Sequence, residues 1–499
     1  MQAKKSGIVS CITAPCGILA QNELTLQPIG LTPVISFDMY IEQLYTNCLA
    51  EAAYYIESDG ESAIIDPLRE TEPYLAMASR RNSRIKYVFE THFHADFVSG
   101  HIDLSRMSGA PIVYGPMAKP AYDVLTANDG QEFAVGKLTI RVLHTPGHTP
   151  ESTCYLLLDE KQQPHAIFTG DTLFVGDVGR PDLLDGVMTS EELASMMYDS
   201  LNHKIKTLPD HVIVYPGHGP GSACGKNIGK ETFSTIGEQK KFNYALKAQS
   251  RAEFVRQVTD GITPPPAYFF EDARINKQGY APVEEVVHRN TKPLSAAAVD
   301  AALESGAVLL DTRDANEFEK GFVPGSINIG LNGQYAVWVG TLLDIHKPIV
   351  LVTTVGKEQE SVLRLARVGY ENVIGYLEGG AAGWKGPLDK VHSIEASEVP
   401  GWLKKGTAVI DVRKPGEWSI SHFKGAQFIP LAEMPLNLAQ LDKSKSYVVH
   451  CAGGYRSMIA ISMMKQQGFT HLINVYGGSA SMINAGLDFV PGDETAVTR

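Results

Sequence analysis

Two segments of 22 residues in this chain share one pattern, and this repetition limits how the C-terminal half is built. The segment VLLDTRDANEFEKGFVPGSINI begins at Val308, and AVIDVRKPGEWSISHFKGAQFI begins at Ala408. The residues that keep this spacing of 100 positions are Asp311, Arg313, Glu317, Gly325 and Ile329, which recur as Asp411, Arg413, Glu417, Gly425 and Ile429. A fixed period over so many positions predicts two copies of one folded unit.

Both copies continue with the same succession of elements. An apolar strand (PIVLVTT in the first copy, SYVVHC in the second) is followed by a helix, another strand and a closing helix. Strands that alternate with helices predict a parallel sheet covered on both faces. We assign residues 274–390 to the first repeat and residues 391–499 to the second.

Residues 39–273 predict a separate, sheet-rich α/β domain, because one core is too small for 499 residues. Short β-rich runs such as AAYYIES, IKYVFET and TCYLLL alternate there with loops. Residues 228–260 read as one helix, which Thr263-Pro264-Pro265-Pro266 ends. Residues 1–38 are expected to be a poorly ordered extension. Lys4 and Lys5 before an apolar run also resemble a weak secretory leader, and Met39 is an alternative start.

Composition excludes several classes of function. The formal net charge of −12 repels nucleic acid, and the basic residues form no stripe. No run approaches the ~20 apolar residues that cross a membrane. The 6 Cys are too few and too irregularly spaced for a disulfide framework, which favours reduced thiols and a cytoplasmic location. A homo-oligomer is compatible with the sequence, although no heptad pattern predicts one.

Four polar segments, each after an apolar run, carry the residue types of a metal site. They are Thr91-His92-Phe93-His94-Ala95-Asp96-Phe97, Thr145-Pro146-Gly147-His148, Gly170-Asp171-Thr172 and Pro216-Gly217-His218-Gly219. Imidazoles and carboxylates from several strand ends can converge on one ion. A lone histidine at a strand end is more often structural, but four such segments in this order favour a metal.

The ordered set H-x-H-x-D, a later His, a later Asp and a last His resembles the metallo-β-lactamase superfamily over about residues 39–273. The resemblance implies an αββα sandwich. In its dinuclear hydrolases, the first His pair and the middle His hold one metal. The motif Asp, the His after it and the last His hold a second, and the later Asp bridges the two. Here Phe97 follows Asp96, and because Phe has no donor atom the second site loses a ligand.

This missing ligand separates two chemistries. A glyoxalase II-like thioesterase clamps its substrate between two zinc ions. In the persulfide dioxygenase branch, the resemblance implies one ferrous iron held by His92, His148 and Asp171, with positions open for O2 and a sulfur substrate. We therefore expect one Fe(II) per chain. Zinc is the alternative ion if His94 also binds.

Four further residues are expected to support this site. By the same resemblance, His94, Asp96 and His218 orient ligands or bound water. The segment Gly179-Arg180-Pro181-Asp182 resembles a G-R-x-D segment in which the Arg lies near the thiol-persulfide substrate. The alternative is that Arg180 merely pairs with Asp182 or Asp185.

In the second repeat, Cys451 begins a Gly-rich turn between a strand and a helix. The turn reads Cys451-Ala452-Gly453-Gly454-Tyr455-Arg456-Ser457. A helix N-terminus stabilises a thiolate and increases its reactive fraction. The glycines let backbone amides turn toward an anion, and Arg456 adds a cation. The pattern favours a reactive thiol over a buried structural cysteine.

This loop resembles the rhodanese pattern C-x-x-G-x-R over about residues 391–499. The resemblance implies that Cys451 carries a sulfane sulfur as a persulfide. Arg456 and the loop amides of Ala452, Gly453, Gly454 and Tyr455 would stabilise it. A related phosphatase family uses a longer loop. The first repeat has Val352-Thr353-Thr354-Val355-Gly356-Lys357-Glu358 at this position and lacks Cys, so it resembles an inactive rhodanese-like domain.

The order of these three parts resembles bacterial fused persulfide dioxygenase-sulfurtransferases. We expect O2 to oxidise a low-molecular-weight thiol persulfide, or inorganic persulfide, to sulfite. Cys451 would then join sulfane sulfur to sulfite as thiosulfate, in sulfide detoxification. One rival is a zinc-dependent glyoxalase II-like thioesterase fused to a sulfurtransferase. Another is a sulfur-carrier or sensing module whose metal site is vestigial.

Overall fold

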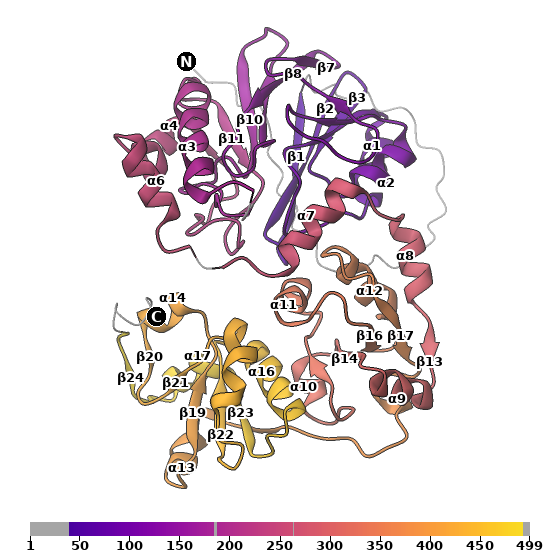
Figure 1. The fold of residues 1–499 in the computed structure, drawn as a ribbon, viewed down its shortest axis with the longest axis vertical. Coiled ribbons are helices and arrows are strands. Elements are labelled where there is room, and N and C mark those ends of the chain that lie inside the picture. Colours follow the sequence, from indigo (N-terminus) through magenta and orange to yellow (C-terminus); the bar gives the residue numbers. More distant parts are fainter. Residues whose placement is uncertain (1–38, 184–186, 263, 493–499) are drawn as a thin grey trace, which may run out of the picture. The chain divides into compact units, whose positions relative to one another are not determined.

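The computed structural model describes residues 39–183, 187–262 and 264–492, so the expected extension 1–38 lies outside the described residues. The chain divides into two compact units (Figure 1). The first holds the described residues up to Glu285 together with Ala366–Gly369. The second holds Val286–Leu365 and the described residues from Tyr370 onward.

The first unit contains two six-stranded sheets, with strand orders β1-β2-β3-β4-β5-β6 and β12-β11-β10-β9-β8-β7. Their strands are β1 (Tyr40–Thr46), β2 (Glu51–Ser58), β3 (Glu61–Ile65), β4 (Arg84–Glu90), β5 (Ile112–Tyr114), β6 (Leu125–Thr126), β7 (Glu132–Val135), β8 (Leu138–His144), β9 (Thr153–Leu158), β10 (Pro164–Gly170), β11 (Ile213–Pro216) and β12 (Ser234–Thr235). The helices are α1 (Glu72–Arg81), α2 (His101–Ser108), α3 (Ser190–Ser200), α4 (Ile236–Phe242), α5 (Tyr244–Lys247), α6 (Arg251–Thr259) and α7 (Tyr268–Gln278), and α8 (Val283–Asn290) crosses the division at Glu285.

Strand alternation explains why this unit has four layers. On β2, Tyr54 points into a core that both sheets share, where its ring lies 4.9 Å from that of Phe168 on β10. The next residue, Tyr55, points the other way and packs with Met77 of α1. Residues such as Met197 of α3 cover the outer face of the second sheet. Both faces of each sheet are therefore buried, as the expected αββα sandwich requires.

The second unit contains one five-stranded parallel sheet from each repeat, with strand orders β13-β17-β16-β14-β15 and β18-β23-β22-β19-β21. The strands are β13 (Pro293–Leu294), β14 (Val308–Asp311), β15 (Ile327–Asn328), β16 (Ile349–Val352), β17 (Val373–Leu377), β18 (His392–Ile394), β19 (Ala408–Asp411), β20 (His422–Phe423), β21 (Gln427–Phe428), β22 (Tyr447–His450), β23 (Leu472–Val475) and β24 (Phe489–Val490). The helices are α9 (Ala296–Glu304), α10 (Ala315–Phe318), α11 (Tyr335–Leu342), α12 (Glu358–Ala366), α13 (Val399–Leu403), α14 (Pro415–Ile420), α15 (Met434–Asn437), α16 (Tyr455–Gln466) and α17 (Gly478–Asn484).

The repeat is conserved in its contacts as well as in its order of elements. Arg313 Nη2 lies 2.6 Å from Asp311 Oδ2 in the first repeat, and Arg413 makes the same contact with Asp411 in the second. Both aspartates are fully buried, at the ends of β14 and β19. The two copies are therefore built on the same internal ion pair.

The single helix predicted for residues 228–260 was wrong. That region forms β12 and then three short helices, α4, α5 and α6. The Asn243 side chain accepts a hydrogen bond from the Ala245 N–H, and the Ser250 side chain accepts one from the Glu253 N–H. Each side chain starts a new helix by satisfying its first amides.

Among the described residues, none of the helices has the length and the apolar composition that a membrane span requires.

Candidate metal centre and sulfur-transfer loop

The predicted metal residues lie just beyond the ends of four strands. His92 and His94 follow β4 of the first sheet, whereas His148, Asp171 and His218 follow β8, β10 and β11 of the second. All five side chains are buried, with exposures of 2% or less. The two sheets therefore deliver the residues to a common place at one edge of the sandwich.

His92, His148 and Asp171 form one compact group. Asp171 Oδ2 lies 3.4 Å from His148 Nε2 and 4.0 Å from His92 Nε2. One ligand atom from each residue lies within 4.8 Å of the others, a spacing that one ion could span. Within the described residues, His148 Nε2 and both Asp171 carboxylate oxygens have no hydrogen-bond partner. Buried polar atoms without partners are costly, so this group fits a bound cation.

The other ring nitrogens of these histidines are already engaged. His148 Nδ1 lies 2.8 Å from the Arg180 carbonyl oxygen, and His92 Nδ1 lies 3.0 Å from Thr91 Oγ1. The Thr91 hydroxyl donates to Asp66, so its oxygen is free to accept from His92. Burial, followed by neighbouring imidazoles, holds the pKa of His92 well below its ordinary value. Both rings therefore turn Nε2 toward Asp171, and this is the nitrogen that is available to a metal.

The second oxygen of Asp171 faces a second group. Asp171 Oδ1 lies 3.5 Å from His218 Nε2, which is also 3.4 Å from Asp96 Oδ2. Burial alone would lower the pKa of His218, but the carboxylates of Asp96 and Asp171 raise it well above its ordinary value. Asp171 thus keeps the bridging position that a two-metal site would use. Asp96 and His218 adjoin the first group, and their role in orienting ligands or water stays a prediction.

Cys224 also joins this second group, which the sequence did not indicate. Its sulfur belongs to a set of potential ligand atoms with Asp171 and His218. Burial, and then the nearby Asp96 carboxylate, raise the pKa of the Cys224 thiol to about 12. Cys224 is therefore a neutral thiol at the edge of the centre. Its position in a loop after β11 gave no motif by which it could have been found.

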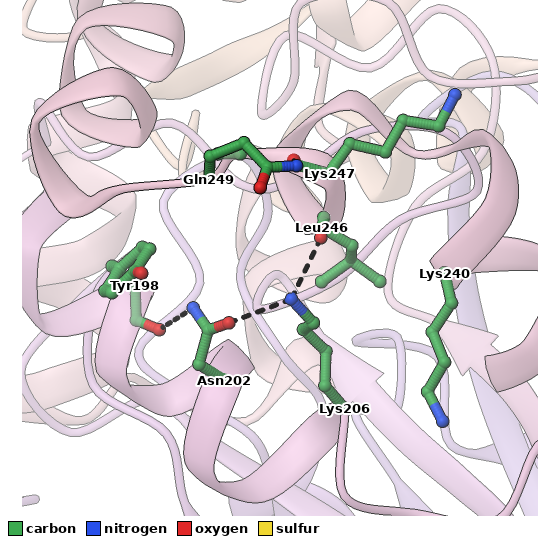
Figure 2. Close-up of a pocket in the computed structure, with 8 residues that line it drawn as sticks. Tyr198, Asn202, Lys206, Lys240, Leu246, Lys247 and Gln249 are labelled. Carbon is green, nitrogen blue, oxygen red and sulfur yellow. Dashed lines mark hydrogen bonds between the residues drawn. The ribbon is translucent and has the colours of Figure 1, made fainter.

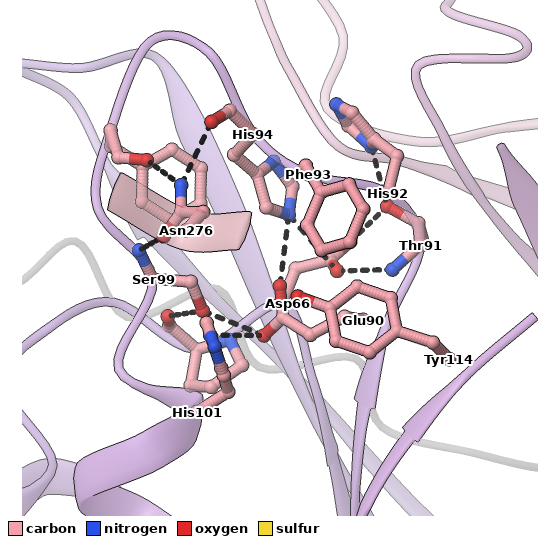
Figure 3. Close-up of polar contacts among 12 residues, drawn as sticks. Asp66, Glu90, Thr91, His92, Phe93, His94, Ser99, His101, Tyr114 and Asn276 are labelled. Atoms are coloured by element: carbon pink, nitrogen blue, oxygen red, sulfur yellow. Dashed lines mark hydrogen bonds and ion pairs between the residues drawn. The ribbon is translucent and has the colours of Figure 1, made fainter. Parts of the chain in front are cut away.

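His94 points toward two carboxyl groups on its other side (Figure 3). Its Nε2 lies 3.1 Å from Asp66 Oδ1 and 3.5 Å from Glu90 Oε2. Glu90 accepts a hydrogen bond of 2.6 Å from the Ser99 hydroxyl, and its Oε1 lies 3.6 Å from His101 Nδ1. Asp66 and Glu90 each stand at the end of an apolar run that forms a strand. This position is the only feature of the sequence that could have indicated them as site residues.

Asn276 of α7 holds the motif loop in place (Figure 3). Its side-chain amide donates to the carbonyl oxygens of His94 and Phe97, both at 2.8 Å, and accepts from the Ser99 N–H at 2.9 Å. The Phe97 ring lies 4.4 Å from the His94 ring and is fully buried. A residue about 180 positions away thus fixes the loop that carries His92 and His94.

Asn276→Ala is expected to loosen the metal loop. Three buried hydrogen bonds are lost, at about 1 kcal/mol each, so the first unit should lose about 3 kcal/mol of stability. Calorimetry would show a lower melting temperature, and metal analysis would show faster loss of metal to a chelator. Asn372→Ala, which removes one exposed hydrogen bond to His346, is the control and should change neither. Equal stability of both variants would contradict this role for Asn276.

Arg180 is close to the centre, but its guanidinium is bound within the protein. Nε and Nη2 donate to the Asp182 carboxylate at 2.6 and 2.7 Å, and the side chain is 5% exposed. This is the pairing that the sequence offered as the alternative. The direct contribution of Arg180 to the centre is its carbonyl oxygen, which faces His148 Nδ1. Contact between the guanidinium and a substrate anion stays a prediction.

In the second unit, Cys451 lies between β22 and α16 as predicted. The Gly454 N–H donates to Cys451 Sγ at 3.1 Å, and Ser457 Oγ lies 3.7 Å from the same sulfur. Gly454 has φ 108°, which favours glycine and turns its amide toward the sulfur. Cys451 is 1% exposed. The loop therefore cradles the sulfur with polar groups at the start of a helix.

Arg456 is held by a residue of the repeated signature. Arg456 Nη2 donates to Glu417 Oε1 at 2.8 Å. Burial would raise the pKa of Glu417, but the hydrogen bonds from the Arg456 side chain and the Lys414 N–H, together with the charges of Arg456 and Arg413, lower the pKa overall. Glu417 therefore stays ionised and keeps the Arg456 cation beside the loop.

Gly478→Ala is expected to disrupt the Cys451 loop. Gly478 has φ +55°, and a Cβ there would lie 2.2 Å from the Cys451 carbonyl oxygen. Backbone must move to relieve such a clash, so sulfur transfer should fall by at least about tenfold. Gly486→Ala is the control, because Gly486 has φ +75° and open space around it. This variant should lose only the stability that a left-handed backbone costs an alanine. Similar activity of both variants in a sulfurtransferase assay would contradict this prediction.

An open depression of about 610 Å³ lies elsewhere on the first unit (Figure 2). Its lining includes Lys206 and Lys240, whose ammonium groups already bind neighbouring oxygen atoms. Lys206 contacts Asn202 and Leu246 (Figure 2). Lys240 contacts Asp210. None of the predicted site residues lines it. The depression therefore offers no additional support for the predicted chemistry.

Known proteins match both parts of the chain. Residues 46–218 match the Metallo-beta-lactamase superfamily, and residues 295–387 and 395–485 each match the Rhodanese-like domain. A probable hydroxyacylglutathione hydrolase, glo2 of Schizosaccharomyces pombe, is 31% identical over 36% of this chain and 76% of its own length. Persulfide dioxygenase ETHE1, mitochondrial, of Homo sapiens is 31% identical over 41% of this chain and 74% of its own length.

A solved structure covers more of the chain. A metallo-beta-lactamase from Staphylococcus aureus subsp. aureus COL is 31% identical, with a TM-score of 0.60 over 68% of this chain and 98% of that one. The relatives carry two different catalytic names, but they share one superfamily. The chain therefore belongs to the metallo-β-lactamase superfamily and carries two rhodanese-like domains after that fold.

Proposed function

We propose that this protein is a persulfide dioxygenase fused to a sulfurtransferase. The first unit would oxidise the sulfane sulfur of a low-molecular-weight thiol persulfide, or of inorganic persulfide, to sulfite. The second would transfer another sulfane sulfur through Cys451 to sulfite, forming thiosulfate. Together the two steps would remove persulfide in sulfide detoxification.

The observation that carries this proposal is the group of His92, His148 and Asp171. Among the described residues, His148 Nε2 and both Asp171 oxygens lack a hydrogen-bond partner, and two imidazoles with one carboxylate match the ligand set of non-haem Fe(II) oxygenases, which leaves positions open. His94, a ligand in dinuclear hydrolases, directs Nε2 to Asp66 and Glu90, while one ligand atom of its ring also lies within 4.8 Å of ligand atoms of Asp96 and His218. Phe97 offers no donor next to Asp96. Both features favour one Fe(II) per chain over two zinc ions.

The overall oxidation balances with O2 and water as co-reactants. RSSH + O2 + H2O gives RSH + SO3²⁻ + 2 H⁺, so the sulfane sulfur loses four electrons and O2 gains them. An iron ion would supply the binding and reduction of O2. The chain's own residues would hold that ion, and buried Asp96 and His218 beside Asp171 could hold a water or a proton for the step.

The transfer step uses groups that surround Cys451. The Cys451 thiolate attacks the outer sulfur of RSSH, an S–S bond forms, and RSH leaves with the electron pair and the proton. Sulfite then attacks the outer sulfur of the Cys451 persulfide, thiosulfate forms, and the thiolate is restored. The Gly454 N–H and the nearby Arg456 would stabilise the anionic sulfur in both directions.

A glyoxalase II-like thioesterase is the second candidate. It is favoured by the bridging position of Asp171 and by a relative named as a hydroxyacylglutathione hydrolase. The deciding experiment measures metal content together with O2 uptake on glutathione persulfide and hydrolysis of a glutathione thioester. One iron per chain with O2 uptake supports the dioxygenase, whereas two zinc ions with thioester hydrolysis would overturn it.

A further inference from the structure

Helix α16, which begins in the Cys451 loop, contacts the first repeat along its length. At its start, the Tyr455 hydroxyl donates to the Gly330 carbonyl oxygen at 2.8 Å. In its middle, Ser462 Oγ accepts from the Asn328 N–H at 2.9 Å. These partners belong to β15 and the turn after it. The helix that follows Cys451 therefore packs against the first repeat, which has no cysteine at the equivalent position.

The turn of the first repeat is shaped to admit the Tyr455 ring. A Cβ added at Gly333 would lie 2.5 Å from Tyr455 Cζ, and one at Gly330 would lie 3.6 Å from Tyr455 Cε2. Gly333 does not lie in the left-handed region, so its backbone would accept other residues. Glycine is required at this position because any side chain would clash with the ring of Tyr455.

Tyr455 lies between the two groups that act on the sulfur. The residue before it, Gly454, directs its N–H to Cys451 Sγ, and the residue after it, Arg456, carries the neighbouring cation. Fixing the Tyr455 side chain therefore fixes the direction of the preceding amide. The residue whose amide contacts the sulfur, Gly454, is thus the direct neighbour of the residue that contacts the first repeat, Tyr455.

We propose that the first repeat completes the sulfur-transfer site by holding Tyr455 against Gly330 and Gly333 of the turn after β15. Tyr455 is then a positioning residue whose side chain acts through the Gly454 amide, and the first repeat has a role without chemistry of its own. This inference rests on the proposed sulfur transfer at Cys451.

The test uses the full chain with thiosulfate as donor and cyanide as acceptor. The Cys451 thiolate attacks the outer sulfur of thiosulfate, sulfite leaves with the electron pair, and cyanide removes the sulfur as thiocyanate. Tyr455→Phe should lower kcat/KM for thiosulfate about fivefold, the value of one neutral hydrogen bond. The rate at which iodoacetamide modifies Cys451 at fixed pH should change as well, while the melting temperature stays within a few degrees.

A double-mutant cycle isolates the contact between the two repeats. Gly333→Val should lower kcat/KM by about tenfold or more, because the new side chain meets the Tyr455 ring. Tyr455→Ala should also lower it, and the double variant should be no worse than Tyr455→Ala alone. Gly401→Val is the control, because Gly401 has no neighbouring atom within 4 Å of a Cβ, and it should behave as wild type.

The outcomes separate this inference from the proposed function. If the wild-type protein transfers no sulfur from thiosulfate, the proposed sulfur transfer fails. If the wild type is active but Tyr455→Phe keeps its kcat/KM and its alkylation rate, the positioning role is overturned. Losses that add up in the Gly333→Val and Tyr455→Ala double variant would likewise overturn it, because independent sites add.

Discussion

Cys451→Ser will abolish thiosulfate formation while O2 consumption with a persulfide substrate continues at the wild-type rate. Serine has nearly the same size but cannot form a persulfide at neutral pH, so the covalent carrier is lost. The O2-dependent reaction belongs to His92, His148 and Asp171, which lie in the other unit. Sulfite should therefore accumulate in place of thiosulfate. Oxygen-electrode traces combined with chromatographic analysis of sulfite and thiosulfate would measure both products.

The matched reciprocal variant is His148→Ala. It removes one of three proposed metal ligands and should abolish O2 consumption, yet transfer from thiosulfate to cyanide should persist because the Cys451 loop is intact. Together the two variants separate oxidation from transfer. Unchanged thiosulfate output from Cys451→Ser would contradict the proposed coupling.

The sequence predicted the architecture well, because the signals for it are local or periodic. The buried strands are short apolar runs: TCYLLL forms β9 (Thr153–Leu158), and IKYVFE falls within β4 (Arg84–Glu90). The spacing of 100 residues predicted two similar sheets, and the two five-stranded sheets confirm this prediction. The Asp311–Arg313 and Asp411–Arg413 pairs show that the local contacts are repeated as well. The prediction of one long helix was wrong because the side chains of Asn243 and Ser250 each cap the start of a new helix. The hydrophobic pattern alone does not reveal such caps.

The candidate site was less fully predictable. Its histidines lie in segments that resemble metal-binding motifs, and the structure places His92, His148 and Asp171 together. Asn276 and Cys224 could not be assigned, because what they contact depends on how α7 and the loop after β11 fold back. The direction of His94 could not be read either. It is decided by Asp66 and Glu90, which come from the ends of two different strands.

Phe97→His is expected to raise the metal content from one ion per chain to two. The substitution places an imidazole directly after Asp96, and His218 Nε2 lies within 3.5 Å of both Asp96 and the Oδ1 oxygen of Asp171. These four residues would then supply a complete second ligand set. Mass-spectrometric metal analysis after reconstitution with excess zinc would count the ions.

The same variant should also depend more strongly on metal for its stability. Phe97 is fully buried, so an imidazole there costs about 1–3 kcal/mol unless it finds a partner. A second ion supplies that partner, so added zinc should raise the melting temperature of Phe97→His more than that of wild type. Phe97→Leu, which keeps the position apolar, should bind one ion and respond as wild type does. Two ions in the wild-type protein would show that Phe97 does not determine the number of metals and that Cys224 or His94 completes the second group instead. One ion in Phe97→His would show that an imidazole at this position does not complete it.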